Sequence, residues 1–132
     1  MTWKTLAFIA ISAPVVAVGT FAQQTQQGGV KRTQLQTIDF PPGFETVTVI
    51  AEIKPGDCAG RHTHPGAETA YVLEGGIVVK IDGKTDFFVK AGEPLRFAPG
   101  VVHDECNFSG RPFRALATYV VEKGKPLTSP AP

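Results

Sequence analysis

After residue 22, the sequence is divided into short alternating runs of apolar and polar residues, with turns between them at a spacing of 8–12 residues. In residues 46–53, for example, Val47, Val49, Ala51 and Ile53 occupy every second position. Successive side chains of a strand point to opposite faces, so this pattern is typical of strands with one buried face. No 11-residue window in this part of the chain has the apolar spacing of a helix. The pattern therefore predicts an all-β sandwich or barrel.

The remaining strands are expected at residues 61–64, 68–73, 77–81, 85–89, 95–97, 101–108 and 113–121. Asp82-Gly83 separates two of these segments and is the dipeptide of a tight hairpin turn. Five phenylalanines are interpreted as core residues because large aromatic side chains favour burial; they are Phe44, Phe87, Phe88, Phe97 and Phe113.

Residues 1–22 have the pattern of a secretory signal peptide. One early lysine precedes a 13-residue apolar stretch at positions 6–18, and small residues flank Phe21 at the end. A second cleavage position follows Gly19. The alternative, a membrane anchor, would need about 20 apolar residues, and Ser12 and Pro14 interrupt this shorter stretch. We therefore expect a periplasmic or secreted protein with no membrane contact after cleavage.

The charge of the remaining chain argues against nucleic acid as a partner. Without Lys4 it carries 12 basic and 12 acidic side chains, and no basic run is longer than Lys31-Arg32. Proteins that bind nucleic acid or anionic membrane surfaces rely on clustered Lys and Arg. A small molecule is the partner that this composition leaves open.

The three histidines of the chain and one glutamate stand at metal-ligand spacing. His62 and His64 lie two residues apart, which places both imidazoles on one face of a strand. The Pro65-Gly66 turn can then reverse the chain and bring Glu68 to the same point, and His103 would arrive from a distant strand. Such ligands suit one divalent transition metal ion, Fe, Mn, Cu, Ni, Co or Zn. The simpler alternative is four unrelated polar residues at strand ends.

Two longer motifs contain these residues. The first is Gly56-x5-His62-x-His64-x3-Glu68-x6-Gly75, and the second is Gly92-x7-Gly100-x2-His103-x3-Asn107. They resemble the two sequence motifs of the cupin family, with sixteen residues between them. One position departs from the family pattern, because Ala98 stands where a proline is usual. The resemblance implies an all-β cupin (double-stranded β-helix, jelly-roll) barrel with metal held by His62, His64, Glu68 and His103.

On this basis the chain divides into four parts. Residues 1–22 are the signal peptide and 23–45 a leader with the first edge strand, of which 23–29 are expected to be flexible. Residues 46–121 form the cupin barrel, and 122–132 a C-terminal surface arm.

Three further residues are candidates for the site. Glu105 and Asn107 share strand parity with His103, so both are expected to point into the barrel. Glu105 is the candidate catalytic base if burial raises its pKa, or else a solvated residue at the barrel mouth. Asn107 could hydrogen-bond a ligand or a metal-bound water. Tyr71 is a weaker pocket candidate that could equally be core.

Cys58 and Cys106 form an even pair in a chain expected to be exported, which favours a disulfide. In a cupin barrel the strands of His62 and His103 would be antiparallel neighbours, and the cysteines lie at opposite offsets from these histidines. Simple alternation nevertheless puts them on different faces unless Gly60 breaks the pattern. The sequence leaves the bridge open.

The resemblance also suggests an enzyme acting on a small molecule. Dioxygenase-like oxidation is slightly favoured over isomerase, lyase or decarboxylase chemistry, because an exported metal site meets O2 readily. The alternatives are a non-catalytic module that binds a metal or small metabolite, and a metal that only stabilises the barrel. A homodimer is expected by family analogy alone.

Overall fold

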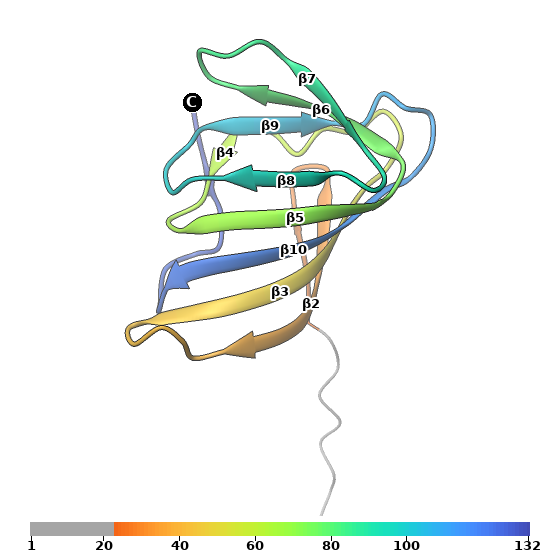
Figure 1. Cartoon of the computed structure of the whole chain (residues 1–132). Helices are drawn as coiled ribbons and strands as arrows, with labels where there is room; N and C mark the ends of the chain where they lie inside the picture. The colour runs from red at the N-terminus through yellow and green to blue at the C-terminus, as the bar shows by residue number, and fades with distance from the viewer. Residues whose placement is uncertain (1–22) are drawn as a thin grey trace, which may run out of the picture.

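The computed structural model describes residues 23–132, which form two antiparallel sheets facing each other (Figure 1). The larger sheet has the strand order β1-β2-β3-β10-β5-β8 and the smaller one β11-β4-β9-β6-β7. The strands are β1 (Gln24–Gln27), β2 (Val30–Ile38), β3 (Phe44–Ile53), β4 (His62–Thr63), β5 (Ala67–Glu74), β6 (Gly76–Ile81), β7 (Phe87–Lys90), β8 (Pro94–Phe97), β9 (His103–Cys106), β10 (Phe113–Glu122) and β11 (Ser129–Pro130). The all-β jelly-roll prediction is confirmed.

The core lies between the two sheets and follows the alternation seen in the sequence. In β3 the buried residues are Val47, Val49, Ala51 and Ile53, and β10 pairs with β3 along its whole length. β10 also pairs with β5, so β3, β10 and β5 present one continuous, mainly apolar face. Strands buried on one face are held in register by this pattern. That face fixes where the polar residues of the interior can lie.

Two of the five phenylalanines expected in the core are buried, Phe97 and Phe113. The other three, Phe44, Phe87 and Phe88, are 39%, 41% and 55% exposed, so their assignment to the core was wrong. Phe87 and Phe88 begin the edge strand β7, where only β6 pairs with them. Position in an edge strand outweighed the general preference of phenylalanine for burial.

Both ends of the described chain are more ordered than expected. Gln24–Gln27, expected to be part of a flexible leader, forms β1 and pairs with β2. The C-terminal arm ends in β11, which pairs with β4, the strand of His62. Main-chain hydrogen bonding to a sheet edge supplies order that the polar composition does not reveal. The expected signal peptide lies outside the described residues.

No helix occurs in residues 23–132, and so none that could cross a membrane.

A disulfide joins Cys58 to Cys106, which pair as antiparallel neighbours. His62 pairs with His103 in the same two segments, so the first segment contains one extra residue between these pairs. Gly60 takes it up with a φ of +84°, a conformation in which glycine has no Cβ penalty, and its N–H donates to Asp104 at 2.8 Å. The bulge moves Cys58 to the face opposite His62, which removes the objection from simple alternation.

Candidate metal centre

The four expected metal ligands converge in the barrel interior. His62 in β4 faces His103 in β9, His64 follows β4, and Glu68 comes from β5 in the opposite sheet. All four side chains are buried, with at most 5% exposed. The turn that connects His64 to Glu68 requires glycine at position 66, because a Cβ there would lie 1.7 Å from the carbonyl oxygen of Val120.

Each imidazole is oriented by a main-chain carbonyl at its Nδ1. The acceptors are Gly60 at 2.7 Å for His62, Leu127 at 2.8 Å for His64 and Val101 at 2.9 Å for His103. A neutral imidazole that donates from Nδ1 presents a lone pair at Nε2. This arrangement is the usual one for metal-ligating histidines, whose second nitrogen bonds a carbonyl or carboxylate.

The three Nε2 atoms have no hydrogen-bond partner in the fold, although all are buried. They lie within 4.8 Å of one another. The Nε2 of His64 is also 2.9 Å from Oε2 of Glu68, with an acceptor on each side of the contact. Two lone pairs at this distance need a cation between them, a proton or a metal ion.

The unpartnered Nε2 atoms of His62 and His103 favour the metal ion, because one proton cannot serve all three rings. The His64–Glu68 distance also fits, since two donor atoms about 2.1 Å from one ion and at right angles are about 3.0 Å apart. The residues present therefore fit a divalent transition metal held by His62, His64, His103 and Glu68.

Burial keeps the rings of His62 and His103 neutral, so their Nε2 atoms are available to a metal ion. It lowers the pKa of His62, and it lowers the pKa of His103 to about 4, despite the hydrogen bonds to Gly60 and Val101. Phe97 stacks on the ring of His103, with centroids 3.6 Å apart and planes 13° from parallel. Burial alone would raise the pKa of Glu68, but contacts with His64, Tyr119 and His103 outweigh it and lower that pKa.

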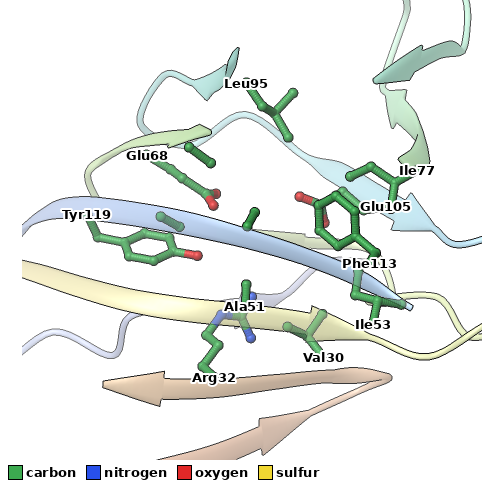
Figure 2. Close-up of a pocket in the computed structure, with 13 residues that line it drawn as sticks. Val30, Arg32, Ala51, Ile53, Glu68, Ile77, Leu95, Glu105, Phe113 and Tyr119 are labelled. Atoms are coloured by element: carbon green, nitrogen blue, oxygen red, sulfur yellow. The ribbon is translucent and has the colours of Figure 1, made fainter. Parts of the chain in front are cut away.

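Glu105 lies inside the barrel beside the histidines, at 7% exposure, and the alternative of a solvated residue at the mouth is wrong. Its carboxylate oxygens are 3.8 Å from Nε2 of His103 and 4.0 Å from Nε2 of His62. Burial, reinforced by the charge of Glu68, raises the pKa of Glu105 to about 8. Glu68 and Glu105 point toward each other across the pocket in Figure 2. The site thus has a second carboxyl that holds a proton readily.

Asn107 and Tyr71, the other two candidates, are placed elsewhere. Asn107 is buried, but its amide donates to the carbonyls of Ile53 and Arg111, and its oxygen accepts from Ser109. These bonds occupy both ends of the amide, so it serves the loop after β9 instead of the ligands. Tyr71 is 51% exposed, because its parity in β5 is opposite to that of Glu68. Neither residue has the role expected from the sequence.

Two pocket residues were missed. Tyr119 in β10 pairs with Glu68 in β5 and is 1% exposed, and Glu68 and Arg32 are polar neighbours of its hydroxyl. Burial and the Glu68 charge raise the pKa of this hydroxyl well above its usual value. Arg32 in β2 lines the same cavity. Tyr119 could have been predicted, because it alternates with Ala115 and Ala117 in the final strand. Arg32 could not, because the sequence pattern does not identify β2 as a strand with an inward face.

The fold is a double-stranded β-helix with a histidine and glutamate cluster in its interior. Residues 49–119 match the cupin domain, more than half of the chain, and the chain belongs to the cupin family. No curated protein matches the sequence.

Solved structures agree on the fold. A conserved protein with a double-stranded β-helix domain from Klebsiella pneumoniae is 20% identical, with a TM-score of 0.64 over 92% of this chain and 99% of its own. A predicted oxalate decarboxylase from Thermotoga maritima is also 20% identical, with a TM-score of 0.60 over 83% and 99%. A DMSP lyase structure is 14% identical, with a TM-score of 0.65 over 78% of this chain and 53% of its own. At identities this low, the likeness supports the fold alone.

Proposed function

We propose that this protein is a metal-dependent cupin enzyme that acts on a small molecule inside the barrel. The observation that carries the proposal is the set of three buried, unpartnered imidazole Nε2 atoms beside Glu68. A structural metal site is closed by its protein ligands, whereas a catalytic one keeps room for a further ligand. Here a cavity of about 20 Å³ adjoins Glu68 and Glu105, enough for a group of about the size of a water molecule.

A bound divalent ion would supply positive charge that polarises a substrate oxygen. In the proposed reaction Glu105 is the proton-transfer group. Burial raises the pKa of Glu105 to about 8 in the metal-free protein, so this carboxyl can take up a proton and return it to a substrate atom in the cavity. Glu68 is the wrong choice for this role, because its lowered pKa keeps it ionised as a ligand.

A buried carboxyl beside the proposed ligands suits proton transfer, which favours redox-neutral chemistry, of lyase or decarboxylase type, over the oxidation expected from the sequence. Oxidation by O2 is the second candidate reaction, and a metal- or metabolite-binding module without activity is the alternative to an enzyme.

Elemental analysis of the purified protein tests the proposal. The wild type is compared with the double variant His62→Ala/His103→Ala and with Tyr71→Ala, whose side chain lies on the outer face. We expect about one transition metal ion per chain in the wild type and in Tyr71→Ala, and none in the double variant. A folded wild type that stays empty after incubation with Fe, Mn, Co, Ni, Cu and Zn salts would overturn the proposal.

Glu105→Gln then separates an enzyme from a binding module. It should retain the metal and lose turnover of any substrate found by screening small carboxylic acids under air and under nitrogen. Turnover that needs O2 would identify the oxidative alternative, and turnover unchanged in Glu105→Gln would remove that residue from the mechanism.

We also propose export to the periplasm or the medium. The Cys58–Cys106 disulfide supports it, because such bridges persist in oxidising compartments. Cell fractionation with mass determination checks it: the exported protein should begin after Ala22 or Gly19, with both thiols blocked to alkylation.

A further inference from the structure

Arg32 is a buried cation without an anionic partner. Arg32 is only 6% exposed, and its Nε has no hydrogen-bond partner. Within residues 23–132 it takes part in none of the ion pairs. Arginine is rarely buried in this way unless it is paired, because an uncompensated charge is costly in the interior. The unmet charge calls for an explanation.

The side chain of Arg32 reaches into the interior cavity that adjoins Glu68 and Glu105. β2 lies at the edge of the inner face, and Arg32 pairs there with Ala51, which in turn pairs with Ala115. Alanines leave room above the sheet, and the guanidinium occupies part of it (Figure 2). Glu68, Glu105 and Tyr119 line the remaining space. The guanidinium therefore shares this cavity with Glu68, one of the four proposed metal ligands.

The charges of the interior do not balance without a further anion. A divalent ion and Arg32 bring three positive charges, whereas Glu68 and Glu105 bring at most two negative ones even when both are ionised. The imidazoles are neutral when they ligate a metal. The loaded site is thus positive, and a negatively charged ligand is favoured there.

A groove outside the barrel leads to the same residue. It has a volume of about 310 Å³ and lies between β1 and the segment Pro126–Thr128 of the C-terminal arm, with Arg32 in its wall. Arg32 also lines the inner cavity, so its side chain lies between the groove and the cavity. A ligand in the groove could place one small group on the guanidinium while the rest stays outside.

We propose that Arg32 binds the carboxylate of a small anionic substrate and holds it between the groove and the metal cluster. The planar guanidinium can bind a carboxylate through two parallel hydrogen bonds, which fixes its orientation as well as its charge. The inner cavity has room for a group of about the size of one water molecule, such as one carboxylate oxygen, and the groove has room for the rest of the ligand. The inference rests on the proposed metal-dependent function and adds the chemical class of its substrate.

Formate titration of the full chain, with and without Zn2+, tests this assignment. The wild type is compared with Arg32→Met, which keeps the length and loses the charge, and with Lys31→Gln. Lys31 is the next residue of β2, faces outward and pairs with Glu52 at 3.4 Å, so its removal is a matched loss of charge. Formamide is the neutral probe of the same size as formate, and metal content is measured on every sample.

We expect calorimetry to show formate binding at least tenfold weaker to Arg32→Met than to the wild type or Lys31→Gln, with no binding of formamide. Arg32→Met should melt no lower than the wild type without formate, because it removes an unpaired buried charge. Equal formate affinity in Arg32→Met and wild type would overturn the assignment, as would a lower melting temperature with unchanged formate affinity.

These outcomes are independent of the metal result. Wild type that holds Zn2+ but shows no Arg32-dependent formate binding would leave the metal-dependent function standing and remove the carboxylate anchor. Wild type that holds no metal would remove the function, while the titration of the metal-free protein still decides whether Arg32 binds the anion.

Discussion

Removal of residues 126–132 should weaken metal binding, although none of them is expected to touch the metal. The carbonyl of Leu127 accepts the Nδ1 hydrogen of His64 at 2.8 Å and so fixes which nitrogen faces the site. β11 in the same segment pairs with β4 and helps to hold His62. Loss of such an outer partner typically lowers metal affinity by about 10- to 100-fold, or about 1.4–2.7 kcal/mol.

The assay is competition for Zn2+ between the protein and a chromophoric chelator. The truncated chain is compared with a shorter truncation that removes only residues 131–132 and retains both β11 and the Leu127 carbonyl. Leu127→Ala is the second control, because it keeps the carbonyl but loses side-chain packing against the core cluster of Val47, Val49, Ala117, Tyr119 and Val121. We expect both controls to bind Zn2+ within about threefold of the wild type, which is a smaller change than the loss of about 10- to 100-fold expected for a lost outer partner.

The reasoning would be refuted if the longer truncation, shown to be folded by circular dichroism, bound Zn2+ as tightly as the shorter one. A loss of affinity in Leu127→Ala as large as in the longer truncation would also contradict it. In that case packing of the arm, and not orientation of His64, would control the site.

Three other changes have expected outcomes. Chelation of the metal should lower the melting temperature, because the emptied site leaves buried acceptors unpartnered, and readdition of Zn2+ should restore it; no change on chelation would argue against a bound metal. Cys58→Ala/Cys106→Ala should lower the free energy of unfolding in urea by about 4 kcal/mol, from the chain entropy of a loop with a sequence separation of 48, and a loss below about 1 kcal/mol would contradict that entropic account. Gly66→Ala should lose metal binding, because the added Cβ would lie 1.7 Å from the carbonyl oxygen of Val120. Gly83→Ala is the control and should bind the metal normally despite the positive φ of Gly83, because no atom lies within 4 Å of a Cβ added there.

The sequence predicted the inner strands and the histidine cluster well because both depend on local spacing. Alternation set the inward face of β3 and β10, and the i, i+2 spacing placed His62 and His64 for one site. The same parity placed Glu105 inside. Strand parity predicts that a side chain points inward, but it does not show whether that side chain lies at the site or farther along the strand. Asn107 points inward and yet hydrogen-bonds a loop.

The disulfide shows a different limit of sequence reasoning. Whether Cys58 faces Cys106 depended on one extra residue near Gly60, and a bulge is invisible in a strict two-residue pattern. The glycine itself was the only signal, since a positive φ is cheap only there. Alternation alone therefore does not predict whether two cysteines on neighbouring strands form a disulfide, because a single backbone conformation can decide it.

Two residues that shape this site lie outside the region that matches the family. Arg32 precedes the matched region of residues 49–119 and Leu127 follows it, yet one lines the cavity and the other orients His64. Both are positioned by strand pairing, β2 on β3 and β11 on β4. The two motifs predict the proposed metal ligands because those residues are placed by local spacing. The charge of the pocket and the access to it depend instead on the flanking segments that cover it. The substrate preference of this protein should therefore be sought in Arg32 and the C-terminal arm as well as in the four ligands.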